Sequence, residues 1–301
     1  MVVRLMVYPV GVAAAVALGI GYVLQQRVAA TVPRSELLHF RLLLDLMRRR
    51  LWWAGTSLII AGQCLSALAL LFGGVAVVDP LLSTSLLVAF VVAAGQKRHA
   101  PRWQEILGAL LLTAALAVFL ADNPPGHDDR LRTTLVATVA GVSATAAVVA
   151  VLVAIARRRA AAREAVLLAA AAGVIYGLQD VATRAALIEL DRRGAMVTFV
   201  SPWPYLVLAA GVFGVLLTQS AFGAARLDYS LPPATATEPV VAIGLGAGLL
   251  GEQLPTSVVS LTLDALCLVA LVVSVVLIGR SPALSVSVPP TSAVMPSGRD
   301  R

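Results

Sequence analysis

Long apolar runs separated by short charged loops make up most of the chain. Charged residues are absent from 51–78, 133–156 and 194–225, and they bound the other runs closely. A helix needs about 20 mostly apolar residues to cross a bilayer. Runs of about that length lie at about 5–25, 51–72, 75–95, 103–121, 133–156, 165–188, 201–225, 231–251 and 257–279. The pattern predicts an all-α, polytopic membrane protein with about nine transmembrane helices.

Two segments depart from this pattern. Residues 35–50 form a short stretch that carries seven ionisable side chains, so we expect an interfacial helix rather than a tenth span. Residues 281–301 are rich in Ser and Pro, and we expect a disordered tail. The first run resembles a signal peptide, but its length and the lack of a clean small-residue cleavage site favour a retained span.

The composition favours lipid as the solvent of these runs. Hydrophobic residues are 59% and charged residues 13% of the chain, whereas soluble domains average roughly 45–50% and about 25%. The net charge of +7 would suggest nucleic acid in a soluble protein. Here the basic residues lie mostly in the loops between apolar runs. We therefore expect contact with the lipid bilayer and no nucleic-acid partner.

Basic residues are distributed unevenly between alternate loops. Seventeen fall in one set of alternate loops together with the C-terminal tail, and five fall in the other set. Loops on the cytoplasmic side carry the excess of Lys and Arg. The pattern predicts a multi-pass protein of the plasma membrane, with its N-terminus outside and its C-terminus in the cytoplasm.

The two halves of the chain share a weak internal repeat. The pattern G-x-x-Y-x-L-Q occurs at 19–25 and again at 173–179, an offset of 154. Gln63 matches Gln219, and 108–110 matches 264–266, both at an offset of 156. We divide the chain into a four-helix repeat at 1–132, a linker span at 133–156 and a second four-helix repeat at 157–280. Because five spans separate equivalent starts, the second copy is expected to be inverted, as in many secondary transporters.

Ionisable side chains inside the spans are the candidates for a functional site. A charge near the bilayer centre costs about 2.5–3.5 kcal/mol on insertion scales, so each such residue needs a partner or a function. Asp180 in the sixth span has Tyr176 and Arg184 one turn away on the same helical face. Asp180 and Arg184 form either a structural ion pair or a cation or proton site that Arg184 neutralises when it is empty.

The eighth and ninth spans add further candidates. Glu238 precedes Pro239, which lacks an N–H group and frees a carbonyl one turn back. A carboxylate beside a broken helix favours a coordination site, although a Glu that faces a wet inner vestibule fits as well. Asp264 in the ninth span is a weaker candidate. Three more residues are candidates either to line the same cavity or to pack and hydrogen-bond between helices: Tyr22, Gln26 and Gln179.

Short motifs link the chain to a known family. The sequence reads GYVLQQRVA at 21–29, WAG at 53–55, DPL at 79–81 and GE at 251–252. On these residues, over about 5–280, the chain resembles the drug/metabolite transporter (EamA-like) superfamily. It is most similar to the branch that contains the NIPA-type magnesium transporters and their uncharacterised bacterial relatives. The resemblance implies solute transport and suggests a divalent cation such as magnesium. We expect Glu252 itself to be an exposed cap at the end of the eighth span.

The residues favour a transporter over an enzyme. The sequence contains no H-E-x-x-H, G-x-S-x-G, Walker A or C-x-x-C signature, so we expect no enzyme and no cofactor. We expect a secondary transporter that moves a small solute by alternating access, with Asp180 and Glu238 as ligands or proton carriers. A divalent cation would use their oxygen atoms, and a proton-coupled metabolite or drug is the alternative substrate. The alternative function is a non-transporting scaffold or assembly protein, which would bury Asp180 in dry packing.

Overall fold

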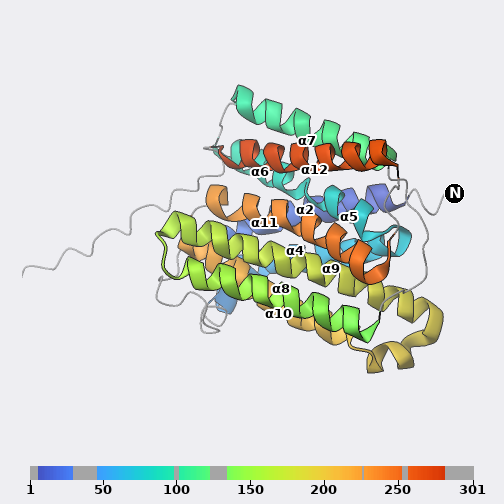
Figure 1. Ribbon diagram of the computed structural model, residues 1–301. Coiled ribbons are helices and arrows are strands. Elements are labelled where there is room, and N and C mark those ends of the chain that lie inside the picture. Colours follow the sequence, from blue (N-terminus) through green and yellow to red (C-terminus); the bar gives the residue numbers. More distant parts are fainter. Residues whose placement is uncertain are drawn as a thin grey trace, which may run out of the picture.

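The long elements of the described chain are helices. The computed structural model describes residues 6–29, 46–97, 102–122, 134–225, 227–252 and 257–281. The elements of the first half are α2 (Val7–Ala29), α4 (Arg50–Phe72), α5 (Val75–Leu82), α6 (Ser85–Lys97) and α7 (Trp103–Asp122). They are followed by α8 (Leu135–Ala156), α9 (Ala161–Val200), α10 (Trp203–Ala224), α11 (Leu227–Leu245), the π-helix η2 (Gly246–Leu250) and α12 (Val258–Gly279) (Figure 1). The all-α prediction is confirmed for these ranges.

The predicted spans match the helices. Within the described ranges nine helical spans are long and apolar enough to cross a membrane, and each coincides with one predicted run. The predicted interfacial segment 35–50 and the predicted tail 281–301 lie largely outside the described residues. The sixth span is longer than predicted, because α9 continues for 40 residues. Gly194 interrupts α9 with a φ of +77°, a conformation that glycine adopts readily.

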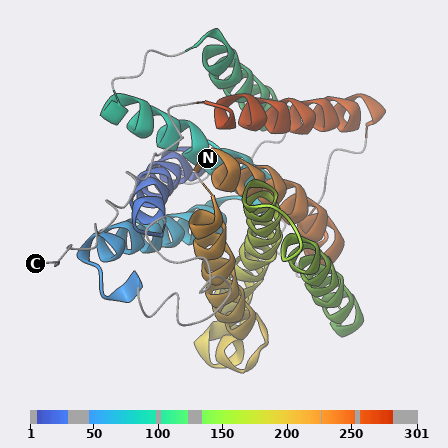
Figure 2. The ribbon, with the colours of Figure 1, turned by 90° about the vertical axis from the view of Figure 1, so that its left-hand side faces the viewer.

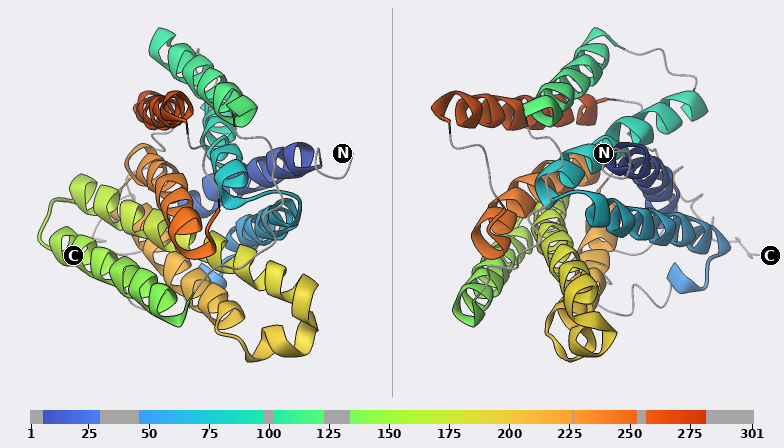
Figure 3. Two further views of the ribbon diagram at one scale, coloured as in Figure 1. Left: turned by 45° about the vertical axis from the view of Figure 1, so that its right-hand side comes forward. Right: turned by 90° about the vertical axis from the view of Figure 1, so that its right-hand side faces the viewer.

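Burial separates a central helix from helices that face outward. Within the apolar 18-residue stretch of α9, 72% of the residues are buried, because α8, α10 and α11 pack around this helix. Only 11% of the α8 window is buried, and the side chains of Leu135 and Val136 are almost fully exposed. Lipid is the solvent that suits such a surface. A second pair, α7 and α12, packs together at one edge of the bundle (Figures 2 and 3).

Small residues let the helices of each half approach closely. A Cβ atom on Gly21 of α2 would lie 3.0 Å from the carbonyl oxygen of Gly55 on α4. A Cβ atom on Gly177 of α9 would lie 2.8 Å from the carbonyl oxygen of Glu238 on α11. Glycine is favoured at such crossings because it lets two membrane helices bring their backbones together. The α9–α11 contact therefore holds Glu238 close to the centre of the bundle.

Two spans contain a proline and an irregular segment. The third span is split between α5 and α6 at residues 83–84, shortly after Pro80, which cannot donate to the carbonyl of Ala76. The eighth span contains Pro239 and ends in η2, after which Gly251 adopts a φ of +69°. Irregular backbone is tolerated in membrane spans where other groups satisfy it. Both interruptions lie where the two halves meet, since α5 packs against α11.

Candidate functional site

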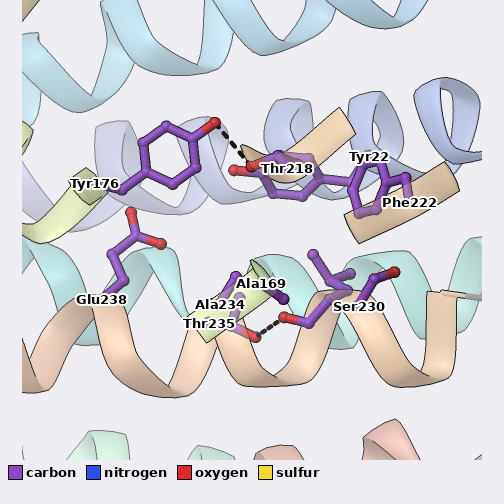
Figure 4. Close-up of a pocket in the computed structure, with 10 residues that line it drawn as sticks. Tyr22, Ala169, Tyr176, Thr218, Phe222, Ser230, Ala234, Thr235 and Glu238 are labelled. Atoms are coloured by element: carbon purple, nitrogen blue, oxygen red, sulfur yellow. Dashed lines mark hydrogen bonds between the residues drawn. The ribbon is translucent and has the colours of Figure 1, made fainter. Parts of the chain in front are cut away.

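A narrow pocket lies where α2 of the first half meets α9, α10 and α11. It has room for a water-sized occupant. The Tyr22 ring meets the Phe222 ring edge to face, and the Thr218 hydroxyl donates to the Tyr176 hydroxyl at 3.1 Å. Figure 4 shows the carboxyl group of Glu238 directed toward the Tyr176 side chain. The lining residues are Tyr22, Ala169, Tyr176, Thr218, Phe222, Ser230, Leu231, Ala234, Thr235 and Glu238.

The predicted residues Asp180 and Glu238 meet in the structure. Their side chains lie within electrostatic reach of each other between α9 and α11, and Asp180 is 4% exposed. Two neighbouring carboxylates in a site shielded from water are costly when both are ionised. Protons or a cation would offset that cost.

Arg184 lies one turn from Asp180 but bonds to a different helix. Its Nη1 atom donates to the carbonyl oxygen of Leu70 on α4. Both Asp180 and Arg184 are buried. Asp180 also lies within electrostatic reach of Glu238, across the α9–α11 crossing. In this arrangement Arg184 therefore ties α9 to the first half of the chain.

Asp79 is a site residue that the sequence reasoning did not select. It lies in α5, is 1% exposed, and is within electrostatic reach of both Asp180 and Glu238. Both of its carboxyl oxygens lack a hydrogen-bond partner among the described residues. A signal was present in the sequence, because Asp79 precedes Pro80 in the third span as Glu238 precedes Pro239 in the eighth. An acidic residue before a proline thus occurs in corresponding spans of the two predicted repeats.

The carbonyl group that Pro239 leaves without a helical partner accepts a hydrogen bond from the first half of the chain. Pro239 cannot donate to the carbonyl of Thr235, one turn back. The Ser83 hydroxyl, at the break between α5 and α6, donates to that carbonyl oxygen at 3.4 Å and to the carbonyl of Asp79 at 3.2 Å. The two broken spans therefore touch where their helical ladders are interrupted.

The predicted glutamines have different surroundings. Gln26 is completely buried, and neither of its amide atoms has a hydrogen-bond partner in the described part of the chain. Gln179 lies close to Gly211 of α10. The neighbouring Gln25 accepts from Gln219 of α10 and donates to Thr56 of α4 at 2.9 Å. Gln25 and Gln219 therefore join the two halves.

Asp264 lies in a different part of the fold. It is buried on α12 and interacts electrostatically with Cys267 of the same helix. It does not belong to the residues that line the pocket. Of the predicted candidates, the structure thus brings together Tyr22, Tyr176, Asp180 and Glu238, and leaves Asp264 apart.

The acidic groups do not form a closed set of metal ligands. Among the residues that the structure describes, no three His, Cys, Asp or Glu side chains lie close enough together to hold a metal ion. Asp79 is within electrostatic reach of the Asp180–Glu238 pair but does not converge with it on a single point. What the three carboxyl groups share is a need for positive charge, which protons or a cationic solute can supply.

Comparison with known proteins gives one distant relative across almost the whole chain. An uncharacterised protein of Corynebacterium glutamicum is 27% identical over 278 residues, which cover 90% of this chain and 94% of that protein. No family model matches the chain. No solved structure matches it either. The likeness extends over the spans and carries no statement about activity.

Proposed function

We propose that the chain is a secondary transporter of the drug/metabolite transporter superfamily, moving a small, positively charged solute in exchange for protons. The observation that carries the proposal is the Asp180–Glu238 pair, buried beside a pocket between the two halves. Buried ionisable groups in membrane spans are costly and usually serve an ion or substrate pathway. Two carboxyl groups this close would hold a proton between them and release it when a cationic solute binds.

The pairing of helices supports an inverted repeat. In the proposed repeat, α2, α4, α5–α6 and α7 correspond to α9, α10, α11–η2 and α12. The pair α2–α4 packs closely, as does its counterpart α9–α10, and α4 contacts α9 as α10 contacts α2. Gly19 packs against Ser85 of α6, and its sequence match Gly173 packs against Ala234 of α11. A pseudo-twofold axis between the halves would produce these pairings.

The position of the pocket supports an inward-facing state. With the C-terminus in the cytoplasm, as the basic loops predict, α11 begins at the inner side. Ser230 and Leu231 of its first turns line the pocket, and so does Phe222 near the inner end of α10. Alternating access requires a second state in which the site is reached from the opposite end.

Both organic cations and Mg²⁺ belong in the substrate panel. Mg²⁺ keeps several waters and is often bound by one or two carboxylates, which the Asp180–Glu238 pair could supply. The narrow pocket favours a small solute over a bulky drug in this state.

Uptake into proteoliposomes tests the proposal. A panel of small organic cations, amino acids and Mg²⁺ is offered with and without a pH gradient, and we expect the gradient to accelerate uptake of an organic cation. Asp180→Asn should lower that uptake about 10- to 150-fold, the factor that corresponds to about 1.5–3 kcal/mol for a charged hydrogen bond. The variant should still fold, because Asn keeps the shape and the polarity of the Asp side chain.

The matched control is Asp191→Asn, an exposed acidic residue on the same helix, which should leave uptake unchanged. Uptake of Mg²⁺ alone, without an effect of the pH gradient, would identify the metal and not an organic cation as the solute. Absence of uptake for every solute, with a well-folded protein, would favour the scaffold function.

A further inference from the structure

Glu252 contacts a helix from the other half of the chain. Its Oε1 atom accepts from the backbone N–H of Val75 at 3.0 Å, and its Oε2 atom accepts from that of Ala76 at 3.3 Å. These N–H groups open α5, where the first turn has no partners within its own helix. The partial positive charge of a helix N-terminus strengthens such bonds to a carboxylate. Glu252 is therefore half-buried and caps α5, and is not the exposed cap of its own span that the sequence predicted.

Two glycines enclose this carboxylate. A Cβ atom on Gly74 would lie 3.0 Å from Oε1 of Glu252, and one on Gly246 would lie 3.2 Å from Oε2. Both distances are shorter than ordinary van der Waals contact. The loop between α4 and α5 and the π-helix η2 thus meet around one side chain, which leaves no room there for other side chains.

The second half holds α5 at both ends. Glu252 binds its N-terminus, and the carbonyl of Thr235 accepts from Ser83 just after its C-terminus. Between these ends lies Asp79, which is within electrostatic reach of Asp180 and Glu238. The pocket, in contrast, is lined by residues from the other end of α11. The N-terminus of α5 and the turn around Glu252 therefore lie on the side away from the pocket, whereas the segment just after its C-terminus reaches the pocket-lining Thr235.

We propose that Glu252 is a latch, whose bonds to Val75 and Ala76 keep this end of the transport path closed and must break before it opens. The inference rests on the proposed alternating-access function. Because the carboxylate and the N–H groups belong to different halves, rocking of one half against the other separates them. The latch adds no ligand for the solute. It sets the balance between the two states.

Cysteine labelling tests the latch without relying on transport. The parent protein has Cys64 and Cys267 changed to Ser, and Val78→Cys places one thiol on α5, at a position that is completely buried in the closed arrangement. In proteoliposomes a membrane-impermeant maleimide is added on the side that carries Glu252. Glu252→Ala should accelerate labelling about tenfold or more, the change in opening equilibrium expected when both charged hydrogen bonds are lost. Glu252→Gln keeps one acceptor oxygen and should give a smaller increase.

The matched control is Glu105→Gln. Glu105 accepts from the backbone N–H of Arg102 at the start of its own helix α7, so its carboxylate caps locally. This change should leave labelling at position 78 unchanged. Equal labelling of the parent and both Glu252 variants, all folded by size-exclusion chromatography, would overturn the latch. Faster labelling in a protein that moves no solute would keep the latch and overturn the proposed transport, so the two failures are distinguishable.

Discussion

Two carboxyl groups meet the short helix α5, and their surroundings differ. Glu252 lies at its N-terminus, where both oxygens accept backbone N–H bonds. Asp79 lies in its middle, 1% exposed, and its oxygens have no hydrogen-bond partner within the described ranges. A carboxylate that backbone donors satisfy stabilises a fold, whereas a buried one without donors is a cost that the fold tolerates for another purpose. The comparison therefore separates a structural from a functional acidic group on one helix.

Asp79→Asn should have the largest effect on this comparison. Removal of the third carboxyl group from the neighbourhood of Asp180 and Glu238 should lower proton-driven uptake about tenfold or more, because one net charge is lost from a site shielded from water. Stability should stay unchanged or increase, since an unpartnered buried charge is removed. Glu252→Ala, in contrast, should lower the thermal midpoint. Thermal unfolding in detergent and uptake measured on the same preparations check both. A fall in stability as large as that of Glu252→Ala would show that Asp79 is structural.

Arg184 provides a second, smaller test. Its bond to the Leu70 carbonyl places it with Glu252 among groups that hold the halves together. Arg184→Gln should cost about 1.5–3 kcal/mol of stability, the range for a charged hydrogen bond. Because Arg184 bonds to the Leu70 carbonyl, its coupling with Asp180→Asn in the double variant should lie at the lower end of the range of about 0.5–3 kcal/mol that neighbouring residues show. The exposed Arg193, paired with Glu189 at 3.3 Å, is the control, and Arg193→Gln should cost about 0–1 kcal/mol.

A larger coupling between positions 180 and 184 would restore the ion pair that helical spacing suggested. Recovery of both stability and transport in the double variant would leave Asp180 as half of a structural pair. Asp180 would then be a structural residue, and Asp79 and Glu238 would remain as the functional acidic residues.

Most of the fold could be predicted from the chain because lipid imposes a simple rule. Every backbone group in the bilayer must be bonded, so long apolar runs form helices, and charges mark their ends. The predicted sixth span ended at 188, because charged residues follow and were interpreted as a loop. In the structure these charged residues are part of α9, which continues to Val200. Periodicity along one helix also placed Asp180 beside Arg184. It carried no information about the α9–α11 crossing, where Gly177 brings the backbone of Glu238 close.

The role of Glu252 depends on contacts that no local pattern contains. Its partners Val75 and Ala76 lie more than 170 positions earlier, and their N–H groups have no sequence signature beyond the preceding Gly74. Asp79 is different, since the acidic residue before a proline in both halves was visible in the sequence. A search for an acidic residue before a proline within the predicted spans would have found it.

Gly74→Ala should have the smallest effect and sharpens the comparison at the latch. A Cβ atom there would lie 3.0–3.2 Å from the carboxyl atoms of Glu252, so the end of that side chain must shift by a few tenths of an ångström. A bond that lengthens is weakened but not lost, and we expect labelling of the thiol at position 78 to rise about two- to fivefold, less than in Glu252→Ala. Gly248→Ala is the control, because a Cβ atom in that part of η2 meets nothing within 4 Å. Gly248→Ala should leave labelling unchanged, and in the Glu252→Ala background Gly74→Ala should add nothing. If Gly74→Ala raised the labelling rate equally with and without Glu252, the glycine would be needed for the conformation of the turn and not for the contact with the carboxylate.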